Sequence, residues 1–111
     1  MLGKFGYMKT VYIIGSKGIP AKYGGFETFV EKLTENQKNK NIKYFVACTR
    51  ENSKKSNISE DFFEYNGATC FSIDVPNIGP AKAIAYDIAA LKKAIEIAKT
   101  NGDKEPIFYI K

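Results

Sequence analysis

The sequence predicts an α/β fold: a Rossmann-like three-layer sandwich with a mostly parallel sheet of about four strands plus a short edge hairpin. Short apolar runs rich in β-branched and aromatic residues alternate along the chain with amphipathic segments of helical period. Strands and helices in this order form parallel, right-handed βαβ units. The 111 residues are enough for one such domain. We therefore predict one domain, residues 9–111, after a short N-terminal extension, residues 1–8.

The first unit is a strand, a loop and a helix. Residues 10–14 are an uninterrupted β-branched and aromatic run, which is typical of a strand buried on both faces. The glycine-bearing loop 15–25 follows directly. After it, four apolar residues at helical spacing predict an amphipathic helix: Phe26, Phe29, Val30 and Leu33.

The middle of the chain supplies the second strand and a hairpin. Residues 44–48 are apolar and predict the second strand, whereas the polar residues 50–61 predict a loop. Asn66-Gly67 separates two β-prone runs, 62–65 and 68–75, and this dipeptide favours a tight hairpin turn. We expect the second arm of the hairpin to become the third main strand.

The last unit is the longest helix and a final strand. Pro80 suits the first helical turn and Gly102 the residue beyond the last, which predicts a helix over 81–99. Its core stripe is predicted from four residues at helical spacing: Ile84, Ile88, Leu91 and Ile95. Residues 107–110 predict another buried strand. Because a ligand-binding sheet normally continues into a loop after such a strand, we expect the chain to be part of a larger unit.

Composition restricts the chemistry available to the chain. There is no histidine, the side chain best suited to proton transfer near neutral pH, so a self-contained enzyme is not expected and no catalytic residue is assigned. Residue spacing indicates no metal site. Cys48 and Cys70 lie in apolar runs and are predicted to be reduced and buried, as in a reducing compartment. Without a run long enough for a signal core or membrane span, we expect a cytoplasmic protein.

The glycine loop has features of a phosphate cradle. Gly24 and Gly25 allow close approach of the backbone, and the helix that starts at Phe26 would present free N–H groups and a positive dipole end. The glycine spacing matches neither the dinucleotide fingerprint nor the Walker motif, and no acidic residue ends the second strand. NAD binding is therefore not expected. Tight turning and close helix packing are the structural alternative for these glycines.

Two motifs resemble one family of enzymes. The segment 15–29, GSKGIPAKYGGFETF, and the segment 76–87, PNIGPAKAIAYD, resemble the amino-terminal domain of bacterial rhamnosyltransferase-like glycosyltransferases of the GT-B fold. The resemblance runs from about residue 8 to residue 110. It implies part of the acceptor-side domain, without the carboxyl-terminal domain that binds most of the nucleotide-sugar donor. No cofactor is implied for this chain itself.

The resemblance also implies residues that face the interdomain cleft. Those at the first loop and helix start would contact the donor diphosphate or the acceptor: Lys17, Gly18, Lys22, Gly24, Gly25, Phe26 and Glu27. Asn77, Tyr86 and Asp87 would flank the carboxyl end of the third strand, where open α/β sheets place ligands. The structural alternatives are solvated lysines, a carboxylate that favours the first helical turn, and a solvated helix charge at Asp87.

Positive charge is concentrated in one stretch of the sequence. This stretch contains a single acid, Glu51, and six basic residues: Lys38, Lys40, Lys43, Arg50, Lys54 and Lys55. Nucleic-acid binding is not expected, because aromatic residues are not interleaved as a stacking platform. Peripheral contact with the inner face of an anionic membrane is a hypothesis, and a solvated loop surface is the alternative.

The leading hypothesis is the amino-terminal fragment of a GT-B sugar transferase in cell-surface polysaccharide synthesis, inactive alone. The parent enzyme would transfer a sugar such as rhamnose from a nucleotide donor to a glycan or lipid-linked acceptor. A stand-alone α/β binding or interaction module, which could form a homodimer through its sheet edge, is the alternative. A small oxidoreductase-like nucleotide-binding domain is a third hypothesis.

Overall fold

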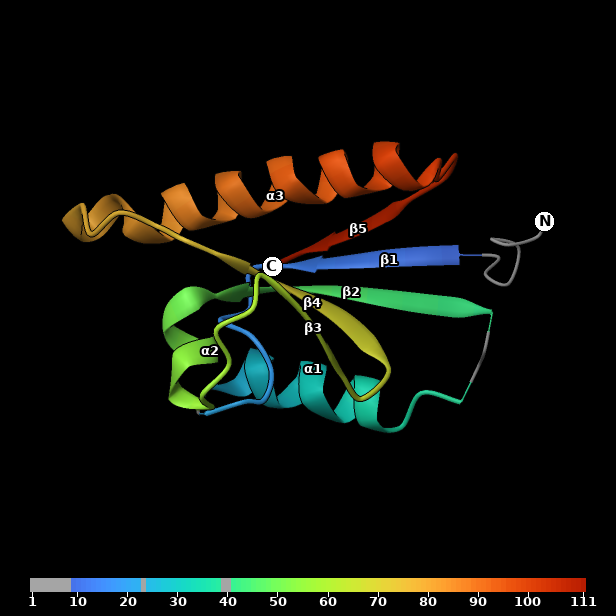
Figure 1. Cartoon of the computed structure of the whole chain (residues 1–111), viewed down its shortest axis with the longest axis horizontal. Helices are drawn as coiled ribbons and strands as arrows, with labels where there is room; N and C mark the ends of the chain where they lie inside the picture. Colours follow the sequence, from blue (N-terminus) through green and yellow to red (C-terminus); the bar gives the residue numbers. More distant parts are fainter. Residues whose placement is uncertain (1–8, 23, 39–40) are drawn as a thin grey trace.

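The computed structural model describes residues 9–22, 24–38 and 41–111, so the expected extension 1–8 lies outside the described residues (Figure 1). The strands are β1 (Lys9–Ile14), β2 (Ile42–Thr49), β3 (Phe62–Tyr65), β4 (Ala68–Ile73) and β5 (Ile107–Ile110). The helices are α1 (Gly25–Glu35), α2 (Arg50–Lys55) and α3 (Lys82–Asn101), with a 3-10 turn η1 (Gly79–Ala81) before α3.

The five strands form one sheet in the order β3-β4-β2-β1-β5. β1 pairs in parallel with β2 and β5, and β2 with β4, whereas β3 pairs antiparallel with β4. The chain runs outward from β1 to β4 and then returns through α3 to β5 on the other side of β1. As a result α1 and α2 lie on one face of the sheet and α3 on the other (Figure 1). The predicted three-layer α/β sandwich with an edge hairpin is confirmed.

The hairpin turn matches its sequence signal. Asn66 and Gly67 both have positive φ, 54° and 78°, as a tight two-residue hairpin turn of this kind requires. Phe62 pairs with Phe71 and Tyr65 with Ala68 across the hairpin.

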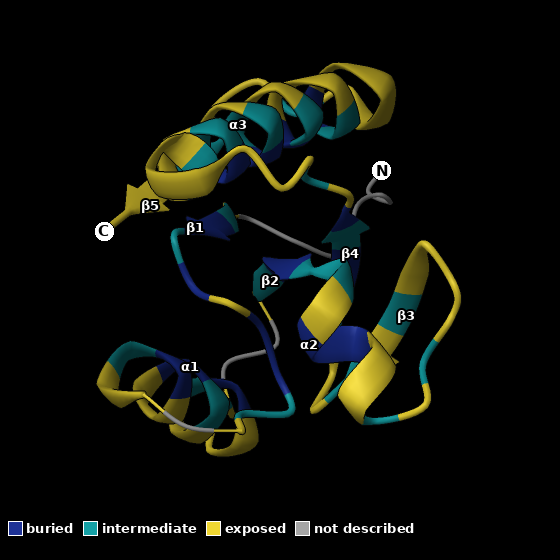
Figure 2. Ribbon diagram, turned by 90° about the vertical axis from the view of Figure 1, so that its left-hand side faces the viewer, coloured by how far each residue is buried: buried dark blue, intermediate teal, exposed yellow. Residues whose placement is uncertain are grey.

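Each face of the sheet has its own core (Figure 2). The α3 face buries mainly large strand residues: Tyr12, Ile14, Phe45, Ala47, Phe71 and Ile73. The other face buries Ile13, Ile19, Val30, Val46, Cys48, Ala68 and Cys70. Both cysteines are free and fully buried, as predicted. The side chains alternate between the two cores along each strand, because successive residues of a strand point to opposite faces.

The predicted core stripe of α3 is wrong. Ile84 is 64% exposed and Ile88 51% exposed. The residues of α3 that are buried against the sheet are smaller, apart from one tyrosine: Tyr86, Ala90, Ala94 and Ala98. Both sets recur every three or four residues, so spacing could not distinguish them. The sheet already supplies large rings on this face, and alanines let the helix approach them closely.

The predicted loop 50–61 begins with a helix. Residues Arg50–Lys55 form α2, and the hydroxyl of Thr49 caps it by accepting a hydrogen bond from the Asn52 N–H at 3.1 Å. The short segment has no apolar period that would predict a helix. Two polar residues are buried instead: Asn52 donates to the Pro20 carbonyl at 3.1 Å, and the Ser53 and Ser72 hydroxyls are 2.8 Å apart. Thr49 as an N-cap was the local signal that could have indicated α2.

Candidate functional site

A cleft of 880 Å³ opens at the carboxyl ends of β1, β2 and β4. We call it the edge cleft. Its lining comes from the loop after β1, the start of α2, the segment after β4 and the start of α3, and it includes Lys17, Asp74, Lys82, Tyr86 and Asp87. Open α/β sheets bind ligands at this edge, because the loops between strands and helices meet there.

The loop after β1 is held by hydrogen bonds with one helix, α1, and one strand, β2. The Lys17 N–H donates to the Glu27 carboxylate at 2.7 Å, and the Ala21 N–H donates to the Glu31 carboxylate at 2.6 Å. The Lys17 carbonyl accepts from the Thr49 N–H at 2.8 Å. These contacts hold the loop in one conformation at the border of the edge cleft.

Gly18 allows this loop to lie directly on β2. Its φ of 127° lies in the region that favours glycine. A Cβ atom added there would be 2.7 Å from the Cβ of Cys48 and 2.8 Å from its Sγ. Gly18 is itself buried, so its place in the predicted site is explained by the close packing of backbone on Cys48.

Tyr86 connects the two motif segments, 15–29 and 76–87, by a hydrogen bond. Its hydroxyl donates to the Ser16 carbonyl at 2.5 Å, across 70 residues of sequence. The ring is 6% exposed, and burial raises the pKa of the Tyr86 hydroxyl well above its usual value, so the group stays protonated and donates. Tyr86 therefore positions the first loop from α3 while it lines the edge cleft.

Asp87 is the predicted site residue whose carboxylate is best placed to bind a ligand. Burial raises the pKa of its carboxyl above the usual value. The other acids of the edge cleft are paired: Glu51 lies 3.6 Å from Lys82, and Asp74 lies 2.9 Å from Arg50. Within the described residues Asp87 has no ion pair, so its oxygens can accept hydrogen bonds from a ligand.

Arg50 is a site residue whose role sequence reasoning missed. It donates to the Asp74 carboxylate at 2.9 and 3.3 Å, to Asp61, and to the carbonyls of Ser59 and Glu60 at 3.1 and 3.3 Å. The guanidinium lowers the pKa of the Asp74 carboxyl. Arg50 thus joins the start of α2 to the ends of two other segments, and local sequence carries no signal for partners so distant.

The remaining predicted residues lie outside the edge cleft. Gly24, Gly25, Phe26 and Glu27 are at the start of α1, on the opposite face of the sheet from α3 (Figure 2). Lys22 and Asn77 are exposed in loops and do not line the cleft.

Glu27 and Phe26 have structural contacts of their own. Glu27 is buried, and its carboxylate lies between the helix start and the Lys17 N–H. The Phe26 ring meets Tyr109 edge-on at 5.8 Å, and the Lys111 Nζ lies 5.4 Å from the Phe26 ring centre. The start of α1 therefore packs against its own loop and β5.

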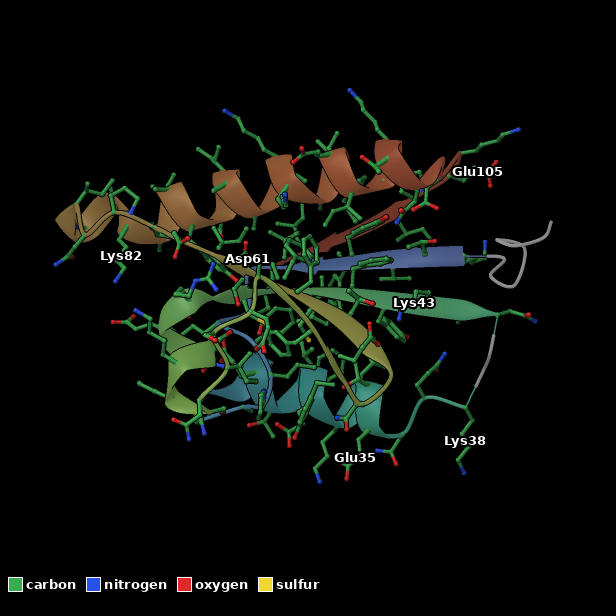
Figure 3. The ribbon with its side chains drawn as sticks, viewed as in Figure 1. Glu35, Lys38, Lys43, Asp61, Lys82 and Glu105 are labelled. Atoms are coloured by element: carbon green, nitrogen blue, oxygen red, sulfur yellow. The ribbon has the colours of Figure 1, made fainter. Side chains whose placement is uncertain are left out.

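The basic stretch is divided between the two ends of the sheet. Lys38 and Lys43 lie near the start of β2, whereas Lys54 and Lys55 lie on α2 beyond its end (Figure 3). β2 has eight residues, or about 26 Å of strand between the two groups. Lys43 also lies 3.5 Å from Glu64. The basic residues that the structure describes therefore do not form one patch, and Lys40 lies outside the described residues.

Comparison with protein families gives a match over nearly the whole chain. A family model described as "Domain of unknown function (DUF1972)" matches residues 8–111. No curated protein and no solved structure matches the chain. Among the described residues, none of the helices has both the length and the apolar character needed to cross a membrane.

Proposed function

The chain belongs to the family "Domain of unknown function (DUF1972)", and we propose that it is the acceptor-side part of a GT-B sugar transferase, resembling rhamnosyltransferases. It would position a glycan or lipid-linked sugar acceptor for cell-surface polysaccharide synthesis. A separate donor-binding domain would hold the nucleotide sugar across the cleft. Without that domain the chain would be inactive.

One observation carries the proposal. The segments that resemble the family, 15–29 and 76–87, lie far apart in sequence, but the hydrogen bond from Tyr86 to the Ser16 carbonyl joins them at 2.5 Å. Lys17 from the first segment and Asp87 from the second both line the edge cleft. A cleft built from both motifs at the ligand-binding edge of the sheet is what an acceptor site on this fold needs.

The chemistry of the cleft suits a sugar with several hydroxyl groups. Asp87 offers carboxylate oxygens as acceptors, and Lys82 and Lys17 bring ammonium groups into the same lining. Pro76 and Val75 add apolar surface. Sugars present both hydroxyls and C–H surface, so a mixed lining recognises them better than one that is only charged or only apolar.

The test is binding measured by amide NMR shifts on the intact chain. Octyl and methyl α-L-rhamnosides and octyl β-glucosides serve as acceptor probes, and a dTDP sugar serves as the donor probe. We expect an octyl or methyl glycoside to shift the amides of residues 15–18 and 82–88, and the donor alone to bind weakly or not at all. Asp87→Asn should weaken glycoside binding by about tenfold or more, as the loss of one charge-assisted hydrogen bond does.

Glu105→Gln is the matched control, because Glu105 lies before β5, far from the edge cleft (Figure 3). It should leave the affinity unchanged. The proposal fails if no glycoside shifts the lining of the edge cleft. It also fails if NAD binds there in preference to the glycosides.

A protein-interaction module is a second candidate, favoured by apolar residues left at the surface. Ile84 and Ile88 on α3 and Ile107 and Ile110 on β5 are each 41% to 64% exposed. The edge of β5 could also pair with a second copy of the chain. Light scattering separates the candidates: a stable homodimer that Ile84→Ser and Ile88→Ser dissociate supports this module, and a monomer contradicts it.

For the location we propose the cytoplasm, with the acceptor reached at the inner face of the membrane. The divided arrangement of the lysines supports a glycan-directed cleft more than a flat membrane-binding surface. Cosedimentation with anionic vesicles at low salt tests the peripheral contact, and the absence of binding would remove it.

A further inference from the structure

Two further cavities lie beside α3, and the first of them adjoins the edge cleft. A second cavity of 470 Å³ shares Arg50 and Asp74 with it. A third cavity, of 380 Å³, shares Phe62, Lys93 and Glu96 with the second. Because neighbouring cavities share lining residues, the three cavities lie in a row along α3, and we call this row the α3 groove.

The α3 groove follows nearly the whole helix. Its α3 wall extends from Lys82 in the edge cleft to Asn101 in the third cavity. Nineteen residue steps of α-helix cover about 29 Å. The site is therefore far longer than a single sugar requires.

The groove exists because α3 covers only part of its face of the sheet. α3 contacts β1, β2 and β4, whereas β3 lies beyond β4 at the edge. Phe62 on β3 is consequently 47% exposed, although its strand partner Phe71 is buried. From α3, the second cavity is lined by the small residue Ala89 and by longer polar residues.

The charges that line the second cavity are balanced, although the chain has a net charge of +5. The second cavity is lined by three basic residues, Arg50, Lys92 and Lys93, and by three acidic residues, Asp61, Asp74 and Glu96. Lys93 lies 3.4 Å from Glu96 and 5.6 Å from the centre of the Phe62 ring. A polyanion would need an excess of positive charge, which this lining lacks.

An exposed aromatic ring among alternating donors and acceptors matches the chemistry of a neutral glycan. The C–H face of a sugar ring can lie against the ring of Phe62, while its hydroxyls bond to the ammonium and carboxylate groups beside it. Thr69 adds a hydroxyl group to the lining of the third cavity.

We propose that the α3 groove binds the glycan chain that extends from the acceptor sugar, so that the substrate class is a neutral oligosaccharide of several units. This inference rests on the proposed function, because the edge cleft is taken as the site of the terminal acceptor unit. Phe62 is the stacking platform of the groove, and Lys93 and Glu96 are its hydroxyl-binding residues.

The experiment compares binding as a function of chain length. Linear rhamno-oligosaccharides and malto-oligosaccharides of one to six units are titrated into the intact chain and followed by calorimetry and amide NMR shifts. The longest chain should bind at least about tenfold tighter than the matching single sugar, with shifts that extend from residues 82–88 to residues 93–101.

Phe62→Ala should abolish the increase in affinity with chain length, so that the longest oligosaccharide binds no more tightly than a single sugar. Phe29→Ala is the matched control, since Phe29 is 48% exposed on α1 at the other face of the sheet. Ala89→Gln narrows the groove without removing a ring, so it should also reduce the gain if Phe62→Ala fails to fold. Thermal unfolding of each variant checks that the fold is retained.

The inference is overturned if affinity does not rise with length, or if Phe29→Ala and Phe62→Ala lower it equally. Shifts at residues 93–101 caused by a poly-glutamate peptide but not by the oligosaccharides would overturn it in favour of a peptide groove. If a single sugar binds the edge cleft but longer chains bind no more tightly, this inference alone is overturned. Absence of binding by every glycoside overturns it together with the proposed function.

Discussion

The two long helices lie on opposite faces of the same sheet but bury different kinds of side chain. α1 buries Val30 fully and leaves Phe29, a residue of its predicted apolar face, 48% exposed. α3 buries Ala90 and Ala94 fully and leaves Ile84 and Ile88 mostly exposed. The difference teaches that the face with the large strand rings takes the helix with the small contact residues. Helical period alone shows that a helix forms, not which of its stripes faces the sheet.

The two flanks of α3 differ as well. Residues of an α-helix advance by 100° each, so Ile84, Ile88 and Ile95 lie on one flank, while Ala89 and Lys93 lie on the other. The second flank lines the α3 groove. Close approach of the alanine stripe to the sheet therefore leaves one apolar flank at the surface and one mixed flank beside the groove.

The largest expected effect comes from enlarging the alanine stripe. Ala90→Leu should destabilise the fold by about 3 kcal/mol, because added methyl groups collide with a close-packed sheet. Ile88→Ala should change the free energy of unfolding by less than about 0.5 kcal/mol, since Ile88 is at the surface. Urea unfolding measures both. If Ala90→Leu left the free energy of unfolding unchanged and Ile88→Ala lowered it, α3 would pack against the sheet through its isoleucines.

The corresponding pair of substitutions in α1, one buried and one exposed, should change stability less. Val30→Ala should cost about 2 kcal/mol through lost burial and the cavity left behind. Phe29→Ala should cost less than about 1 kcal/mol, because Phe29 is half exposed and only stacks on Phe26 at 6.3 Å. Denaturant midpoints compared at equal m-value test this order, and the reverse order would place Phe29 in the core.

Each helix also anchors the first loop, through Glu27 on α1 and Tyr86 on α3. Tyr86→Phe should cost about 1 kcal/mol, and Glu27→Gln a similar amount, because each removes or weakens one hydrogen bond to a loop backbone group. Hydrogen exchange of residues 16–18 should speed up in both variants. Unchanged exchange in Tyr86→Phe would show that the loop does not depend on its contact with α3.

The smallest expected effect is a difference in pKa between the carboxyl groups of Asp87 and Asp74. Burial raises the pKa of Asp87 on α3, whereas the hydrogen bond from Arg50 lowers the pKa of Asp74 after β4. The contribution of Asp87 to stability is therefore fully present below its unfolded pKa and is lost as pH rises through its raised folded pKa. The contribution of Asp74 is present above its unfolded pKa and is lost as pH falls through its lowered folded pKa.

Carbon-13 NMR titration of the carboxyl groups should find Asp87 protonated at a pH where Asp74 is still ionised. Arg50→Gln should raise the pKa of Asp74 and leave that of Asp87 nearly unchanged. Equal midpoints for the two groups in the parent chain would contradict the difference in their surroundings.

Much of the site could be predicted because it depends on strand ends. Lys17, Tyr86 and Asp87 follow or flank predicted strands, and the structure brings them to one cleft. Arg50 was identified only as a basic residue, because its partners Asp61 and Asp74 lie 11 and 24 residues away. The α3 groove has no sequence signal, since it results from β3 extending beyond the area that α3 covers.

The sequence by itself determined the strands, the two long helices and the turns that end them, but not α2. β-branched runs specified the parallel strands, Asn66-Gly67 specified the hairpin turn, and Gly102 ends α3 with a positive φ of 72°. These features depend on backbone preferences of neighbouring residues. Only the tertiary structure decided which stripe of α3 is buried and how Tyr86 meets Ser16. Those outcomes depend on the volumes and polar groups of residues far apart in sequence, which interact only when the sheet brings them into contact.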